Sequence, residues 1–283
     1  KLGDTNLILD NTPIRLSGNP RYVGQHIYTT KPGLALHINA FNFPAWGMCE
    51  KLAVALLAGV PVVTKPGTST ALVAHKIMEV LDASGLLPEG ALSMVIGGAG
   101  DMLDHLTSND VVAFTGSAAT GAVVKGNANI VANNVAVTVE ADSLNAAVLC
   151  PAVKVDSPTW EMFVNEVIND LTQKAGQKCT ATRRILVPTA LLEDVKERFI
   201  EELEETRVGN PALRGVKVSP LATRDQLNDF NTGITTLKKQ ATVIFGDKPP
   251  TLTDIQGDKG YFVCPTLLQA NSDDLSLINS VEV

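Results

Sequence analysis

The residue with the clearest chemical potential is a cysteine in a predicted loop. Cys179 lies in a Gly-Gln-Lys-Cys-Thr stretch at 176–180, between a predicted helix and a predicted strand. A thiol beside small and cationic residues ionises more readily, and the thiolate is the nucleophilic form. The alternative is an inert, packed thiol, the commoner role of a cysteine. The other cysteines, Cys49, Cys150 and Cys264, lie in apolar runs, which favours that inert role for them.

A carboxylate and an amide follow two other predicted strands. Glu140 closes the apolar run 135–139, and Asn42 follows the run 34–41 just before a proline turn. Open α/β sheets bind ligands at the carboxyl edge of their strands. Glu140 is therefore a candidate general base, and Asn42 a candidate hydrogen-bond donor at the same edge. The alternatives are an exposed acid at a strand end and a turn-forming asparagine.

Two more loops could contact phosphate or sugar groups. Gly116 and Ser117 follow a strand and open a helix, where free N–H groups attract anions. A purely structural helix cap is the alternative for Ser117. Lys65 ends another strand at that edge. A Gly-Gly-Ala-Gly run at 97–100 also follows a strand, but the dinucleotide pattern fails at Leu103, and we interpret this run as a plain turn.

Alternating strands and helices must position these residues. In the first half, the predicted strands are 34–41, 60–65, 92–96, 111–114 and 135–139, and the predicted helices are 46–58, 70–84, 101–106 and 118–125. Parallel strands need crossover helices, so the alternation predicts an α/β fold with a doubly wound, Rossmann-like parallel sheet. A second α/β domain follows, and we expect the two domains to span 1–150 and 151–283.

Composition excludes several other classes of protein. The 283 residues are 45% hydrophobic and carry a formal net charge of −7, so the chain is globular and its charge disfavours nucleic acid as a partner. The apolar run 52–63 is too short to cross a membrane. The cysteines lack zinc-like spacing, which predicts no metal site and a reducing cytoplasm. We interpret the acidic cluster as the solvated face of a helix at 190–207; it comprises Glu201, Glu202, Glu204 and Glu205.

Together these residues resemble the aldehyde dehydrogenase superfamily. The order and spacing of Asn-Phe-Pro at 42–44, Lys-Pro at 65–66, Phe-Thr-Gly-Ser at 114–117, Glu140 and Gly-Gln-Lys-Cys at 176–179 carry the resemblance. It implies an NAD(P)-dependent oxidoreductase that converts an aldehyde to a carboxylic acid. The first domain would then bind the nucleotide, and the second would supply the catalytic thiol.

The resemblance also implies individual roles. Cys179 would be the nucleophile, Glu140 the general base, and Asn42 with the Cys179 N–H the oxyanion hole. Lys65 would contact the adenosine ribose and the Gly116–Ser117 turn the pyrophosphate. The acid of a Glu-x-Phe-Gly-Pro motif, here Glu282, would hold the nicotinamide ribose.

Departures from the common pattern narrow the branch. Glu140 is followed by Ala-Asp-Ser-Leu-Asn at 141–145, where common members have Leu-Gly-Gly, and the 116–121 stretch is also distinctive. Both resemble the PaaZ-type and benzoyl-CoA-pathway semialdehyde dehydrogenases, which act on CoA-linked semialdehydes in aromatic catabolism. Glu140 favours hydrolysis of the thioester. A CoA-acylating dehydrogenase and an inactive, oligomeric binding module are the alternatives.

The nucleotide preference depends on one position. Family members that prefer NAD usually have a glutamate where this chain has Thr68, so we expect NADP as the cofactor, with NAD as the alternative. The competing interpretation is that Thr68 and Ser69 only cap the next helix.

The chain resembles an internal piece of a family member. It starts without a Met and stops just after Glu282, before Phe-Gly-Pro. We therefore expect both domains to be incomplete, the full-length protein to be a cytoplasmic homo-oligomer, and the piece by itself to turn over weakly.

Overall fold

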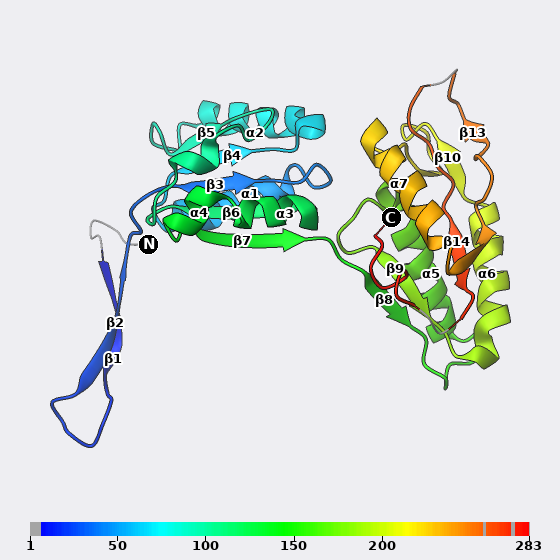
Figure 1. Cartoon of the computed structure of the whole chain (residues 1–283), viewed down its shortest axis with the longest axis horizontal. Coiled ribbons are helices and arrows are strands. Elements are labelled where there is room, and N and C mark those ends of the chain that lie inside the picture. The colour runs from blue at the N-terminus through cyan, green and yellow to red at the C-terminus, as the bar shows by residue number, and fades with distance from the viewer. Residues whose placement is uncertain (1–6, 257–258, 273–274, 283) are drawn as a thin grey trace. The chain divides into compact units, whose positions relative to one another are not determined.

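The computed structural model describes residues 7–256, 259–272 and 275–282 (Figure 1). The chain forms two compact units that meet in sequence between Ala141 and Asp142. The boundary expected at 150 differs from this division by one strand, β8 (Asn145–Val148). β8 belongs to the second unit because it pairs with β9 (Thr182–Leu186).

A five-stranded parallel sheet organises the first unit, in the order β5-β4-β3-β6-β7 (Figure 1). Its strands are β3 (Ala35–Ile38), β4 (Val62–Lys65), β5 (Leu92–Met94), β6 (Val111–Gly116) and β7 (Ala136–Ala141). The chain runs from β3 outward to β5, then returns to the other side of β3 for β6 and β7. This is the predicted doubly wound α/β topology, and its switch point lies between β3 and β6.

Helices connect these strands, and both faces of the sheet are buried. The helical segments are α1 (Trp46–Leu57), η1 (Thr68–Thr70), α2 (Ala71–Ser84), η2 (Met102–His105), α3 (Ala118–Lys125) and α4 (Ala128–Ala132). Successive residues of β3 enter different cores: Leu36 packs with Phe114, whereas Ala35 packs with Met48. A strand covered on both faces has no polar alternation, which is why these strands read as continuous apolar runs.

An antiparallel hairpin precedes the sheet, where the sequence predicted no element. It consists of β1 (Leu7–Arg15) and β2 (Val23–Thr29). Every residue of β2 is exposed except Gly24, which is half-buried. A strand that buries no face leaves no alternating hydrophobic pattern, so sequence reasoning could not detect it.

The second unit is an α/β assembly of short sheets around two long helices. Its helical segments are α5 (Pro158–Thr172), η3 (Gln173–Gly176), η4 (Thr189–Leu191), α6 (Leu192–Glu204) and α7 (Arg224–Leu237). Besides β8 and β9 its strands are β10 (Arg207–Gly209), β11 (Val216–Val218), β12 (Ala241–Phe245), β13 (Leu252–Thr253) and β14 (Leu267–Ala270). In the core, Phe163 of α5 stacks on Phe199 of α6 with ring centroids 6.0 Å apart. No helix in the described part of the chain is both long and apolar enough to cross a bilayer.

One buried carboxylate ties the starts of β3 and β6 together. Asp110 is only 6% exposed and accepts hydrogen bonds from the Leu34 N–H (2.7 Å), the Thr107 N–H (2.7 Å) and the Thr107 hydroxyl (2.8 Å). Burial opposes ionisation, but these hydrogen bonds outweigh it and hold the pKa of Asp110 below its ordinary value.

Replacing Asp110 with Asn should therefore lower the free energy of unfolding by about 1–3 kcal/mol near pH 7. The NH₂ group of the asparagine would face one of the three groups that donate hydrogen bonds to the carboxylate, and that hydrogen bond would be lost. A depressed folded-state pKa gives stability that is present above the unfolded-state pKa and is lost as the pH falls through the folded-state pKa. The difference between wild type and Asp110→Asn should thus shrink below about pH 4, as measured by urea denaturation.

Asp82→Asn is the matched control, because Asp82 is an exposed aspartate on α2. It should change the free energy of unfolding by less than about 0.5 kcal/mol. A pH-independent loss in Asp110→Asn would contradict the role of the carboxylate.

Candidate functional site

The predicted site residues of the first unit lie at the carboxyl edge of its sheet. Asn42 lies in the bend after β3, Lys65 ends β4, Gly116 ends β6 with Ser117 next to it, and Glu140 is the penultimate residue of β7. All five strands run in the same direction. The structure therefore places these residues at one edge, as the sequence predicted, while their roles stay predictions.

Close packing explains the glycine at the end of β6. A Cβ on Gly116 would lie 2.7 Å from the Phe114 ring, so a side chain there would displace the core. Ser117 is the N-cap of α3: its hydroxyl accepts from the Thr120 N–H (3.3 Å) and donates to the Thr120 hydroxyl (3.0 Å). The structural interpretation of Ser117 is thus confirmed, and a phosphate contact by it belongs to the proposal below.

The loop after β4 offers a cation and hydroxyl groups. Lys65 is half-buried, burial lowers the pKa of its ammonium, and Nζ donates to the Pro66 carbonyl at 3.2 Å. Thr68 is exposed, and its hydroxyl reaches the Gly97 carbonyl only at 3.5 Å. Neither Thr68 nor Ser69 caps α2, because the N-cap position is Thr70 and no side chain bonds there. The capping interpretation of Thr68 is therefore wrong.

Glu140 is exposed, and a long hydrogen bond contacts its carboxylate. It pairs with Thr115 of β6 in the strand register, and the Thr115 hydroxyl donates to its Oε2 at 3.4 Å. A carboxylate in contact with solvent can receive a proton from water, and it also fits the alternative of an exposed acid at a strand end.

In the second unit, Cys179 lies exposed in a sharp turn. The preceding residues Lys174, Ala175 and Gly176 all have positive φ (54°, 53° and 72°), which reverses the chain after α5. Exposure does not set Cys179 apart, because Cys49 and Cys150 are exposed as well. The apolar runs around these two do not bury them: Cys49 lies on the exposed side of α1, and Cys150 in the turn after β8. Cys264 is half-buried, and burial raises the pKa of its thiol.

Lys178 is anchored in the interior beside this turn. Its side chain is 7% exposed, and Nζ lies 2.8 Å from both Asp170 Oδ1 and Gln173 Oε1. The other oxygen of Asp170 accepts from the Thr182 hydroxyl (2.9 Å). Burial opposes ionisation of Asp170, but the bonds from Lys178 and Thr182 outweigh it and lower its pKa. The sequence treated Lys178 as a cation for the thiol, whereas the structure pairs it with Asp170.

The backbone carbonyl of Cys179 is held by two side chains. The Ser143 hydroxyl donates to it, and so does Asn145 Nδ2 at 2.7 Å. Asn145 Nδ2 also donates to the Ala181 carbonyl at 3.1 Å. The Lys178 side chain and the Cys179 carbonyl are therefore both held by hydrogen bonds.

Glu282 lies against the same segment. It is half-buried, and burial together with repulsion from Asp142 raises its pKa, although Arg183 and the Ser143 N–H act in the opposite direction. A hydrogen bond between Asp142 and Glu282 also favours the protonated form. The structure thus places Glu282 in the second unit, beside the start of the segment that holds Cys179.

The sequence profile of the Aldehyde dehydrogenase family matches residues 17–280. The chain belongs to the aldehyde dehydrogenase family. A 3,4-dehydroadipyl-CoA semialdehyde dehydrogenase of Aromatoleum evansii is 42% identical over 268 residues, which are 94% of this chain and 52% of that protein.

Solved aldehyde dehydrogenase structures share the fold. Betaine aldehyde dehydrogenase from Staphylococcus aureus in complex with NAD+ matches with a TM-score of 0.79 at 24% identity, over 93% of this chain and 50% of that one. The structure of 3,6-anhydro-L-galactose dehydrogenase in complex with NAP (NADP) also gives 0.79 at 24% identity, over 95% and 55%. The chain spans about half the length of the curated relatives it matches.

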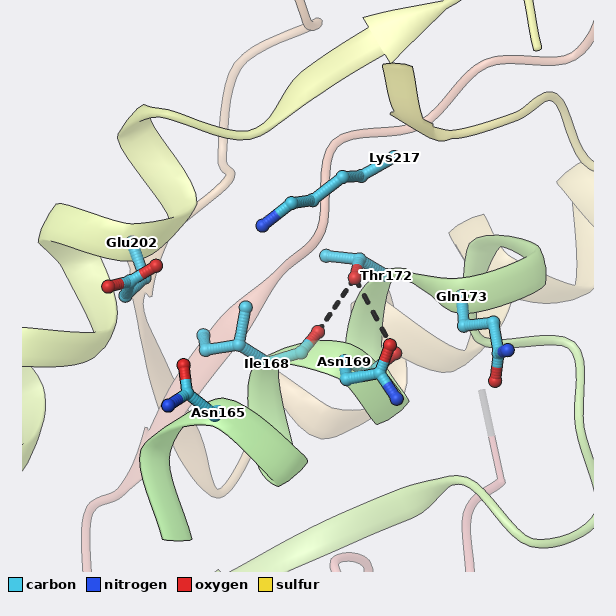
Figure 2. Close-up of a pocket in the computed structure, with 7 residues that line it drawn as sticks. All are labelled: Asn165, Ile168, Asn169, Thr172, Gln173, Glu202 and Lys217. Carbon is cyan, nitrogen blue, oxygen red and sulfur yellow. Dashed lines mark hydrogen bonds between the residues drawn. The ribbon is translucent and has the colours of Figure 1, made fainter. Parts of the chain in front are cut away.

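The second unit of this aldehyde dehydrogenase chain has a pocket that none of the predicted site residues lines. Figure 2 shows it between α5, α6 and β11, with the Lys217 side chain extending across it. It is lined by Asn165, Ile168, Asn169, Thr172, Gln173, Glu202 and Lys217. Through Gln173 it borders the anchor of Lys178. Glu202 is tied to Arg198 at 2.7 Å, so the acidic face of α6 is partly ion-paired.

Sequence reasoning missed the residues that support Cys179. Asp170, Ser143 and Asn145 act through partners that lie 8 to 36 positions away. The one signal in the sequence is the unusual 141–145 stretch. It indicates the branch of the family, but it does not reveal that two of its side chains contact the Cys179 carbonyl.

Removing the cation from the anchor should destabilise the second unit. Lys178→Met leaves Asp170 partly buried without its charge partner, so the free energy of unfolding should fall by about 2–4 kcal/mol. Adding Asp170→Asn should restore part of that loss, because no unpaired charge is then left. Denaturation of the single and double variants measures the coupling.

Lys196→Met is the control, because Lys196 pairs with the exposed Glu193 at 2.9 Å. It should cost no more than about 1 kcal/mol. Strictly additive losses in the double variant would show that Lys178 and Asp170 do not depend on each other.

Proposed function

We propose that the protein carrying this chain oxidises an aldehyde to a carboxylic acid, with a nicotinamide nucleotide as the electron acceptor. The observation that supports this most is the exposed Cys179 in a braced turn of a chain that belongs to the aldehyde dehydrogenase family. A thiol on the surface can meet a substrate, and a fixed backbone can direct its attack.

The reaction begins at the thiol. The Cys179 thiolate adds to the aldehyde carbon, and the carbonyl oxygen becomes an oxyanion. The Asn42 amide and the Cys179 N–H are proposed to hold this oxygen. A donor fixed in advance stabilises the oxyanion more than the neutral carbonyl, and one such donor accelerates the step by about 10²–10³.

The groups at the sheet edge fit a phosphate-rich nucleotide. Lys65 supplies a cation, Thr68 an exposed hydroxyl, and Ser117 a hydroxyl at the start of α3. Helix N-termini and ammonium groups both favour anions. In the second unit, Glu282 is proposed to hold the nicotinamide ribose. A bound nicotinamide ring accepts hydride, and the residues of this chain hold and orient it.

Release of the product needs a base. Loss of hydride leaves a thioester on Cys179, and the Glu140 carboxylate takes a proton from the water that attacks it. Transfer of the acyl group to free CoA would not need this carboxylate, so Glu140 favours the acid as the product.

The proposed substrate class is supported by the relative from Aromatoleum evansii. At 42% identity, that 3,4-dehydroadipyl-CoA semialdehyde dehydrogenase supports a CoA-linked semialdehyde as the substrate here. The homo-oligomer and the cytoplasmic location expected from the sequence stay predictions.

Glu140→Gln separates the two halves of the reaction. In the protein carrying this chain, this variant should release about one equivalent of reduced nucleotide per site and then stall, because hydride leaves before water is activated. Rapid mixing with a free and a CoA-linked dicarboxylic semialdehyde measures the burst. Cys179→Ala should show no burst, and Cys49→Ala, which removes another exposed thiol, should behave as wild type.

Loss of the burst in Cys49→Ala would overturn the assignment of the nucleophile. Full turnover of Glu140→Gln only when free CoA is added would establish the acylating reaction instead. No thiol-dependent burst with any aldehyde would indicate an inactive binding module.

The preference between nucleotides is expected to depend on Thr68. The loop 65–69 presents a cation and hydroxyl groups with no carboxylate, so a 2′-phosphate meets donors and no repulsion, and NADP should be preferred. Thr68→Glu should shift the ratio of kcat/KM toward NAD by at least about tenfold. Steady-state kinetics with both nucleotides measure the ratio.

Thr235→Glu adds the same charge to an exposed position of α7 and should leave the ratio unchanged. A wild-type preference for NAD, or an unchanged ratio in Thr68→Glu, would show that the 2′-position is recognised elsewhere.

A further inference from the structure

We propose that Ser143 and Asn145 are positioning residues for the nucleophile, and that together they clamp the carbonyl of Cys179. The inference rests on the proposed role of Cys179. It assigns a function to the 141–145 segment, whose residues take no part in the chemical steps above.

Both lone pairs of the Cys179 carbonyl are used by this clamp. The oxygen accepts from the Ser143 hydroxyl and from Asn145 Nδ2 at 2.7 Å. A carbonyl oxygen has two acceptor positions, so two donors leave the peptide no free rotation. The peptide between Cys179 and Thr180 is thereby fixed in one orientation.

The amide of Asn145 can serve only in this orientation. Its Nδ2 lies 2.7 Å from the Cys179 carbonyl, 3.1 Å from the Ala181 carbonyl and 3.1 Å from the Ser143 hydroxyl oxygen. Carbonyl oxygens only accept, so the NH₂ end must face them. An aspartate has the same shape with no donor, which makes it the sharpest substitution at this position.

The pairing of β8 with β9 places Ser143 and Asn145 beside the turn that contains Cys179. Asn145 begins β8 and pairs with Thr182, the first residue of β9, which directly follows the turn of Cys179. The register then shifts between Asn145 and Ala146. Asn145 is thus placed beside the end of the turn by parallel pairing, and Ser143 precedes it by two residues.

The clamp works together with the Lys178 anchor. Lys178 is held on one side of Cys179 by Asp170, at 2.8 Å, and the clamp holds the carbonyl on the other side. The Lys178 carbonyl also accepts from the Ala181 N–H at 3.1 Å, so the peptides on both sides of Cys179 are held. This restrains the backbone dihedrals of Cys179, and with them the directions of its Cα–Cβ bond and its N–H. Misalignment of a reacting group by about 1 Å costs roughly 100-fold in rate.

Two reagents distinguish alignment from thiol reactivity in the protein carrying this chain, without nucleotide. Acylation by p-nitrophenyl acetate forms the S–C bond, passes through an oxyanion and expels p-nitrophenolate. Alkylation by iodoacetamide displaces iodide and forms no oxyanion. The first depends on both the thiolate and the backbone geometry, whereas the second depends on the thiolate and its exposure.

Asn145→Asp should slow the p-nitrophenyl acetate burst by at least about tenfold with its amplitude retained, because the sites are intact but misaligned. Alkylation of Cys179, followed by mass spectrometry, should stay within about twofold of wild type. Ser143→Ala should also slow the burst, and Ser143→Thr, which keeps the hydroxyl, should restore it. These variants keep the test decisive if Asn145→Asp folds poorly.

Asn129→Asp is the matched control. In the first unit, Asn129 Nδ2 likewise bridges two backbone carbonyls, those of Leu103 (2.9 Å) and Leu106 (2.8 Å). Asn129→Asp should leave the rate of the p-nitrophenyl acetate burst and the rate of Cys179 alkylation unchanged.

A wild-type burst rate in both Asn145→Asp and Ser143→Ala, with Cys179→Ala silent, would overturn the clamp and leave the nucleophile standing. A fall in burst amplitude at an unchanged rate constant would also overturn it, because that result indicates lost folding. A burst that persists in Cys179→Ala would overturn the proposed function, and the clamp with it.

Discussion

The parallel pairing of β3 with both of its neighbours is the constraint on which the first unit depends. Ala35 is aligned with Val62 of β4 and Val111 of β6, and both alignments hold through Ile38. Alternate residues of β3 enter separate cores, so a slip by one residue would exchange their environments. Burial therefore fixes the register, and the register decides which polar residues reach the carboxyl edge.

In the second unit, the proposed nucleophile Cys179 lies outside helices and strands, so strand register does not position it. Cys179 follows three residues with positive φ, a conformation that the backbone does not hold by itself when two of the three carry a side chain. Side chains restrain this segment and the residues after it. Arg183 donates to the Gly176 carbonyl at 2.8 Å. The buried Lys178 ammonium is hydrogen-bonded on one side of Cys179, and Ser143 and Asn145 bind the carbonyl on the other side. These contacts hold the loop backbone in one conformation, as strand pairing does in a sheet.

Polar groups in this chain fall into two classes. Asp110 and Asn129 belong to the class that stabilises the fold: they are buried or half-buried and have hydrogen-bond partners. Of the residues with proposed chemical roles, Cys179, Glu140 and Thr68 are exposed, whereas Asn42, Lys65 and Glu282 are half-buried. The exposure of Cys179 and Glu140 has a physical reason, because a group that must meet a substrate or exchange a proton with water cannot have all its hydrogen-bonding capacity used in the interior.

The sequence by itself determined the elements that depend on consecutive residues. The helix at 118–125 and the end of α2 at Gly85, which has a positive φ of 61°, were both predicted. So was the arrangement of Asn42, Lys65 and Glu140 at strand ends, since parallel strands share one edge. Only the tertiary structure decided the short strands β10, β11, β13 and β14 of the second unit, and the partners of Lys178 and of the Cys179 carbonyl. Asn145 lies 34 positions from Cys179, and local periodicity carries no information on which distant donor strand pairing will bring to a given carbonyl.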